Sequence, residues 1–193
     1  MRLFTALDLP PDILLRLERL LSALRPEAVI KWSPLDNLHI TTKFIGEWPE
    51  HRIDELDAVL RRVRLGEPFD VELADLGWFP NAHSPRVLWA GVHGGDALSS
   101  LAARSDEALI DLGIAKELHP FSPHLTLARI KNTVPLQRLR AKVEEFQATP
   151  IGRFRATGFV LFRSDPGSNS SIYRKLRSYE FAAELGKTAQ QQS

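Results

Sequence analysis

Two short stretches of this sequence repeat the same pair of reactive side chains. His39 stands two residues before Thr41, and His124 stands two residues before Thr126. Each pair lies in a short apolar run bounded by turn residues, which is typical of a β-strand. Residues two apart on a strand face the same side. Each stretch therefore presents an imidazole beside a hydroxyl, and two such sets could hold a phosphate between an acid and a base.

The double occurrence is more informative than either pair alone. With six His and eight Thr in 193 residues, random placement would give about 0.25 His-x-Thr matches. Two matches in strand-like settings, about half a chain apart, are much less expected by accident. The remaining histidines lack a Thr at this spacing and are interpreted as surface or turn residues; they are His51, His83, His93 and His119.

Strand-like and helical segments alternate along the chain, and each motif strand is followed by a helix. An apolar stripe with three- and four-residue steps predicts a helix over 11–24, and the motif strands are expected at 38–46 and 122–130. Periodicity alone indicates a mixed α/β domain. The other expected strands are 2–8, 29–32, 69–73, 87–92, 154–163 and 172–181; the other helices are about 49–64, 95–112 and 135–146, with loops at 77–86 and 164–171.

Composition excludes several classes of protein. A hydrophobic fraction of 44% and a charged fraction of 25% suit an ordinary globular domain. The net charge of +1 argues against a strongly basic protein that covers long stretches of nucleic acid. A local basic patch could still bind one RNA end. The absence of Cys excludes disulfides, thiolate zinc sites and cysteine nucleophiles. No apolar segment is long enough for a signal peptide or a membrane span, so a cytoplasmic protein without membrane partners is expected.

The motifs His39-Ile40-Thr41-Thr42 and His124-Leu125-Thr126-Leu127 resemble those of the 2H phosphoesterases, in particular their RNA 2′,3′-cyclic phosphodiesterase (2′-5′ RNA ligase-like) branch. The resemblance covers residues 1–182 as a single bilobal domain and leaves 183–193 as a polar, flexible tail. It implies an α+β fold with two pseudo-symmetric lobes, each an antiparallel sheet with helices packed outside, and an active-site cleft between them. Further support comes from Arg2 to Pro10, Asn37 to Leu38, Lys43 to Gly46, Pro85 to Val92 and Pro123 to Arg129.

The resemblance also implies an activity, namely hydrolysis of RNA 2′,3′-cyclic phosphate ends, or of nucleotides that carry this group, to 2′-phosphomonoesters. His39 would protonate the leaving 3′-oxygen and His124 would activate the attacking water, as two histidines near their ordinary pKa can. The hydroxyls of Thr41 and Thr126 would bind the phosphoryl oxygens. No metal or cofactor is expected, and a monomer is expected.

Five further residues are candidates for binding substrate. In relatives the residue five places after each motif His contacts the nucleoside; here these are Phe44 and Arg129, which could clamp a base. Strict alternation would place them on the wrong face unless the strand ends, twists or bulges, and the alternatives are a core Phe44 and a surface Arg129. Lys43 shares the face of His39 and either reaches a phosphate or is solvated. Ser164 and Tyr173, which flank the loop at 164–171, are possible cleft-lining residues.

Several alternatives remain open at this point. The same two histidines could join RNA ends through a 2′-5′ bond, or act on a small cyclic nucleotide or a cyclic phosphate of ADP-ribose. A module that binds nucleotides or RNA without turnover belongs to another class, and intact His and Thr in both motifs argue against it. A metal site is disfavoured because each motif offers only one good ligand. Two satisfied core histidines are the structural alternative.

Overall fold

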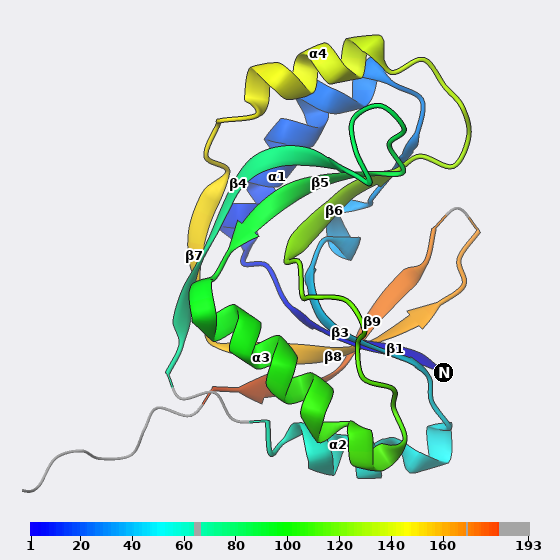
Figure 1. The fold of residues 1–193 in the computed structure, drawn as a ribbon, viewed down its shortest axis with the longest axis vertical. Helices are drawn as coiled ribbons and strands as arrows, with labels where there is room; N and C mark the ends of the chain where they lie inside the picture. The colour runs from blue at the N-terminus through cyan, green and yellow to red at the C-terminus, as the bar shows by residue number, and fades with distance from the viewer. Residues whose placement is uncertain (64–66, 169, 182–193) are drawn as a thin grey trace, which may run out of the picture.

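The computed structural model describes residues 1–63, 67–168 and 170–181. It has two antiparallel sheets with helices on their outer sides (Figure 1), which confirms the predicted α+β fold. The first sheet has the strand order β3-β1-β8-β9 and the second has β2-β6-β5-β4-β7. The strands are β1 (Arg2–Leu7), β2 (Lys31–Trp32), β3 (Ile40–Glu47), β4 (Phe69–Phe79), β5 (Val87–His93), β6 (His124–Arg129), β7 (Gly152–Ala156), β8 (Gly158–Asp165) and β9 (Ile172–Glu180).

Two of the helices connect the two sheets, because each follows a strand of one sheet and packs on a strand of the other. Helix α1 (Pro11–Leu24) follows β1 of the first sheet but packs on β7 of the second, beside α4 (Gln137–Phe146). Helix α3 (Gly95–Ala108) follows β5 of the second sheet but packs on β3 of the first, beside α2 (Ile53–Leu60) (Figure 1). Short 3-10 turns complete the set: η1 (Arg25–Glu27), η2 (Leu35–Asn37), η3 (Glu50–Arg52) and η4 (Ile110–Leu112). Among the described residues, no helix has the length and apolar character needed to span a membrane.

The helix predicted over 11–24 is confirmed, and its apolar stripe faces inward. Ile13, Leu17, Leu21 and Leu24 form its inner stripe and are fully buried. Pro11 begins the helix, where a missing backbone N–H costs nothing. Gly113 caps η4 in the left-handed conformation, with φ of 81°, which glycine adopts readily because it has no side chain.

The strand predicted at 154–163 is wrong as a single strand. Phe154 pairs with Val71 in the second sheet, whereas Phe159 pairs with Tyr179 in the first, so the chain changes sheets at Thr157. Gly158 permits the change because a Cβ there would lie 2.4 Å from the Tyr179 carbonyl oxygen. Apolar residues continue across Thr157, so the hydrophobic pattern predicted one strand where the structure has two.

The loop predicted at 77–86 is also too long. Strand β4 continues through Phe79, which pairs with Val87 of β5. The register of β4 against β5 shifts beside Asp75, whose φ is 65°. This irregularity interrupts the alternation of apolar and polar residues by which a strand is predicted. The predicted tail at 183–193 lies outside the described residues.

Candidate active site

The two motif strands come from different sheets and contact each other. Strand β3 is at one edge of the first sheet, and β6 lies next to the short edge strand β2 of the second. His124 begins β6, whereas His39 is the residue just before β3 begins. The fold thus places the two His-x-Thr motifs opposite each other, as the resemblance implied.

Both histidines are held in the same way. The ring Nδ1 of His39 lies 2.7 Å from the Asn37 carbonyl oxygen, and that of His124 lies 2.8 Å from the Ser122 carbonyl oxygen. A carbonyl oxygen only accepts hydrogen bonds, so each Nδ1 carries its proton and donates it. Each neutral ring therefore has an unprotonated Nε2 that can accept a proton. The Nε2 of His39 lies 3.0 Å from the Thr41 hydroxyl, which confirms that these two residues share a face.

A β-bulge follows each motif Thr. In the pairing of β1 with β3, Ala6 pairs with Thr41 and Thr5 with Lys43, so Thr42 is an extra residue. In the pairing of β5 with β6, Trp89 pairs with Thr126 and Leu88 with Ala128, so Leu127 is extra. An extra residue shifts the alternation by one place. The bulges therefore return the position five residues after each His to the face that carries the Thr.

The face that holds His39 is aromatic. The His39 ring lies 4.7 Å from the Phe4 ring and 5.1 Å, edge-on, from the Tyr173 ring, measured between centroids. Phe4, Ala6, Val160 and Phe162 form a small buried cluster on this side of the first sheet, separate from the main core. His124 has one such neighbour, Phe79, at 5.0 Å. The first imidazole is consequently much more enclosed by apolar groups than the second.

Two hollows lie at the motifs, and each is lined by the His of one motif and the Thr of the other. We call them the His39 hollow, of about 210 Å³, and the His124 hollow, of about 430 Å³. The first also contains Lys31, Trp32, Ser33, Pro34, Asn37, Thr126, Arg129, Lys131, Ser170, Ser171 and Tyr173. The second also contains Thr41, Thr42, Lys43, Phe44, Ser99, Ala102, Ala103, Asp106, Glu117, His119, Pro120, Phe121 and Ser122.

Phe44 and Arg129 both reach the site, but at different ends. The Phe44 side chain is 59% exposed and lines the His124 hollow, so the core alternative for this residue is wrong. Arg129 is exposed and lines the His39 hollow. Each of the two residues thus lines one of the two hollows, and a clamp of both side chains on one base stays a prediction.

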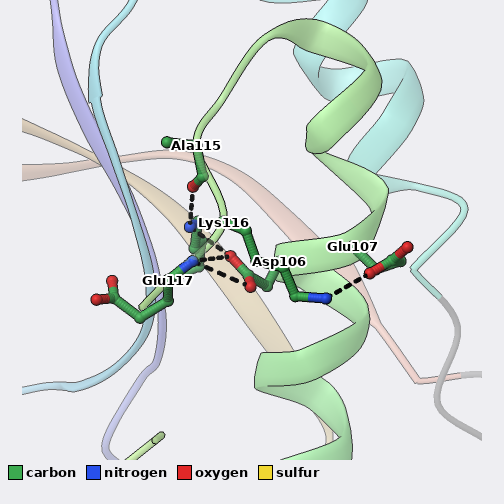
Figure 2. A network of polar contacts seen from close by, with 6 residues as sticks. Asp106, Glu107, Ala115, Lys116 and Glu117 are labelled. Atoms are coloured by element: carbon green, nitrogen blue, oxygen red, sulfur yellow. Dashed lines mark hydrogen bonds and ion pairs between the residues drawn. The ribbon is translucent and has the colours of Figure 1, made fainter. Parts of the chain in front are cut away.

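The interpretation of Lys43 as a solvated residue is wrong, and its ammonium group is held by other residues of the protein. It is buried, and its Nζ lies 2.5 Å from the Asp106 carboxylate and 2.8 Å from the Ala115 carbonyl oxygen. The Asp106 carboxylate also accepts the Glu117 backbone N–H, at 3.1 and 3.2 Å (Figure 2). Burial works to raise the pKa of Asp106, but the Lys43 and Glu117 hydrogen bonds outweigh it and lower the pKa. The first motif strand is thereby bound to the segment that leads into the second motif.

The two remaining candidates differ in position. Tyr173 lines the His39 hollow and contacts His39 edge-on. Ser164 pairs with Tyr173 across β8 and β9 but, among the described residues, is not part of the lining of either hollow. Asn37 also donates a hydrogen bond of 2.6 Å to the Ser171 carbonyl oxygen, which ties the loop between β8 and β9 to the wall of the His39 hollow.

Burial lowers the pKa of His39 to about 4. The hydrogen bond to Asn37 acts to raise it, but the positive charges of Arg129 and His124 act with burial to lower it. In the free protein at neutral pH, His39 is therefore a neutral imidazole. A phosphate anion bound between the two histidines would reverse the charge around His39 and raise its pKa, which would supply a protonated imidazole at the moment an acid is needed.

The depressed pKa of His39 has a consequence for stability. Between pH 6.5 and pH 4 the unfolded chain binds a proton on His39 that the folded protein does not, so this residue makes stability fall as the pH falls through that window. The loss is at most about 3 kcal/mol. We expect His39→Gln to flatten the pH dependence of the unfolding free energy between pH 6.5 and 4, as measured by urea unfolding. An identical slope in both proteins would contradict the pKa assignment.

Several residues of the site were missed by sequence reasoning. Asn37 and Ser122 each stand two places before a motif His and orient it through a backbone carbonyl, a role for which no side-chain pattern exists. His119 is exposed, as the sequence analysis expected, and it also lines the His124 hollow. Trp32 lines the other hollow, with its indole N–H donated to the Ala28 carbonyl oxygen. The only available signal for Trp32 was its place in the sequence, just before the turn into the first motif.

The chain has many relatives of known name. The sequence model of the 2′-5′ RNA ligase superfamily matches residues 9–168. An RNA 2′,3′-cyclic phosphodiesterase of Methanocaldococcus jannaschii is 31% identical over 93% of this chain and 100% of its own length. One of Thermus thermophilus is 32% identical over 97% of this chain and 93% of its own length. The crystal structure of Escherichia coli LigT complexed with 3′-AMP has a TM-score of 0.75 at 26% identity, covering 93% of this chain and 97% of that one.

Proposed function

This chain belongs to the 2′-5′ RNA ligase superfamily, and from that premise we propose that it hydrolyses RNA 2′,3′-cyclic phosphate ends to 2′-phosphomonoesters. Relatives of nearly equal length are named for this activity, and a structural neighbour binds a nucleoside monophosphate, 3′-AMP. The substrate is an RNA 3′ end or a nucleotide with a 2′,3′-cyclic phosphate. A cytoplasmic location and a monomeric state stay predictions.

One observation carries the proposal. Two imidazoles on motifs that belong to different sheets each have Nδ1 anchored to a backbone carbonyl, and each lines a hollow that also contains the Thr of the other motif. In-line opening of a cyclic phosphate needs a base on one side of phosphorus and an acid on the other. A single histidine could not occupy both positions, and two satisfied core histidines would not line two surface hollows.

We assign the roles of the two histidines as the family resemblance implies them. His124 removes a proton from the water that attacks phosphorus, and His39 gives a proton to the 3′-oxygen as its bond to phosphorus breaks. The hydroxyls of Thr41 and Thr126 donate hydrogen bonds to the phosphoryl oxygens, where negative charge develops. Since His39 is neutral in the free protein, it takes up its proton together with the anionic substrate. Arg129, in the same hollow as His39, contributes a permanent positive charge.

With His39 as the acid, the nucleoside that carries the 3′-oxygen lies in the His39 hollow. The aromatic surfaces there are Trp32 and Tyr173, on which a base can stack without regard to its identity. Phe44 then lies on the side of the attacking water. Among residues 1–63, 67–168 and 170–181 there is no group of three or more His, Asp or Glu side chains arranged to hold a metal ion, and independence from metals is tested directly below.

The proposal is tested with purified protein and an RNA oligonucleotide that ends in a 2′,3′-cyclic phosphate, with excess EDTA present. We expect full conversion to a product that co-migrates with an authentic 2′-phosphate standard and not with the 3′-phosphate. Activity abolished by EDTA and restored by a divalent cation would contradict the two-histidine mechanism. Binding of the RNA without any turnover would identify the protein as a nucleotide-binding module instead.

A further inference from the structure

The His39 hollow opens onto a basic wall that the proposed reaction does not use. Lys31 and Lys131 line it beyond Arg129, and both are exposed. Arg86 adds a fourth cation nearby, because its guanidinium donates to the Lys131 carbonyl oxygen at 3.3 Å. This cluster stands out in a protein whose net charge is only +1.

These cations lack the partners that basic residues have elsewhere. On the same sheet, Arg153 pairs with Glu72 and Arg155 with Asp70. In the described part of the chain, no carboxylate forms an ion pair with Lys31, Arg129 or Lys131. Unpaired positive charge beside a proposed phosphate site is available for a second anion.

The register of β2 makes the cluster unfavourable for the free protein. Lys31 and Arg129 are direct cross-strand partners in the pairing of β2 with β6. Like charges directly opposite each other on antiparallel strands destabilise the pair. An anion bound between the two side chains would remove that repulsion, so the arrangement fits a surface that is completed by its ligand.

From these observations we propose that Lys31 and Lys131 bind the phosphodiester on the 5′ side of the terminal nucleoside, so that the protein prefers RNA strands to mononucleotides. This inference rests on the proposed function, which places the terminal nucleoside in the His39 hollow against Trp32. The chain of an RNA substrate then leaves the hollow past the two lysines. Lysine binds a phosphate as a point charge and carries no base preference.

The test compares one substrate that carries that phosphodiester with one that lacks it: a trinucleotide with a 2′,3′-cyclic phosphate end, and a mononucleoside 2′,3′-cyclic phosphate. Lys31→Gln and Lys131→Gln should each raise KM for the trinucleotide roughly three- to tenfold, with KM for the mononucleotide unchanged. Each should also reduce the slope of log(kcat/KM) against log salt, for the trinucleotide, by about 0.7. Lys116→Gln, which removes one exposed charge that is paired with Glu107, is the matched control and should change neither substrate.

The melting temperature shows separately whether a variant has a folding defect. It should not fall in Lys31→Gln, because this change removes the repulsion between Lys31 and Arg129. Equal losses for both substrates, or an unchanged KM for the trinucleotide, would overturn the inference while leaving the proposed function in place. Failure of the unaltered protein to turn over either substrate would overturn the proposed function and this inference with it.

Discussion

Replacing either His39 or His124 by Ala lowers kcat on an RNA with a 2′,3′-cyclic phosphate end by about 10²- to 10⁴-fold, the usual contribution of a positioned acid or base. Both imidazoles are anchored at Nδ1, and each lines a hollow together with the Thr of the other motif. The remaining Thr hydroxyls still contact the phosphate, so KM should change much less than kcat. Because the two groups act in one step, the double variant should lose far less than the product of the two single losses.

The control for these variants is His93→Ala. His93 is exposed and contacts Asp75 at 3.1 Å, and it belongs to neither hollow among the described residues. Its kcat should equal that of the unaltered protein. A His39 or His124 variant with normal kcat would remove that residue from the mechanism.

The acid and the base can be told apart with a substrate whose 3′-oxygen is replaced by sulfur. A thiolate leaves phosphorus without receiving a proton, so this substrate does not need the acid. His39→Ala should therefore recover most of its activity on the sulfur substrate, whereas His124→Ala should stay inactive. Recovery by His124→Ala instead would make His124 the acid and His39 the base. The low pKa of His39 in the free protein is the reason to test this exchange, because a neutral imidazole can act as a base.

Lys43→Met is expected to destabilise the protein by about 3–5 kcal/mol, the cost of leaving one member of a buried ion pair without its partner. The Lys43 and Asp106 side chains are only 4% and 11% exposed. For a chain of this size such a loss corresponds to a fall of about 6–20 °C in the melting temperature. Urea and thermal unfolding of the single variants would measure it.

A double variant distinguishes the charge from the contact. Lys43→Met combined with Asp106→Asn removes both charges while the Asn side chain can still accept the Glu117 backbone N–H. It should be more stable than the sum of the single losses predicts. The matched control is Lys116→Met, which breaks the exposed pair with Glu107 (Figure 2) and should cost no more than about 1 kcal/mol. Equal losses for Lys43→Met and Lys116→Met would contradict the assignment of a buried, stabilising pair.

Local patterns in the sequence were sufficient for the parts of the protein that depend on neighbouring residues. The buried stripe of α1 follows from three- and four-residue steps, and the left-handed turn at Gly113 follows from the absence of a side chain. The shared face of His39 and Thr41 follows from strand alternation over two residues. Each of these features is decided within one or two turns of chain, where backbone geometry dominates.

Features that depend on residues distant in the sequence were decided only by the tertiary structure. Lys43 was expected to be solvated or to reach a phosphate because alternation takes no account of the bulge at Thr42, or of an aspartate 63 residues away that binds its Nζ. The change of sheet at Thr157 depends on the close approach of Gly158 to the Tyr179 carbonyl, which no local pattern records.

The sequence by itself determined which side chains can perform the chemistry: two His-x-Thr pairs, in a family that the comparisons bear out. Only the tertiary structure decided how they are used. It brought β3 and β6 together from two sheets, placed Phe44 in the lining of one hollow and Arg129 in that of the other, and surrounded His39 with Phe4 and Tyr173. The physical reason is that the pKa of a group and the shape of a cleft depend on what surrounds them in space, and those surroundings come from segments far apart along the chain.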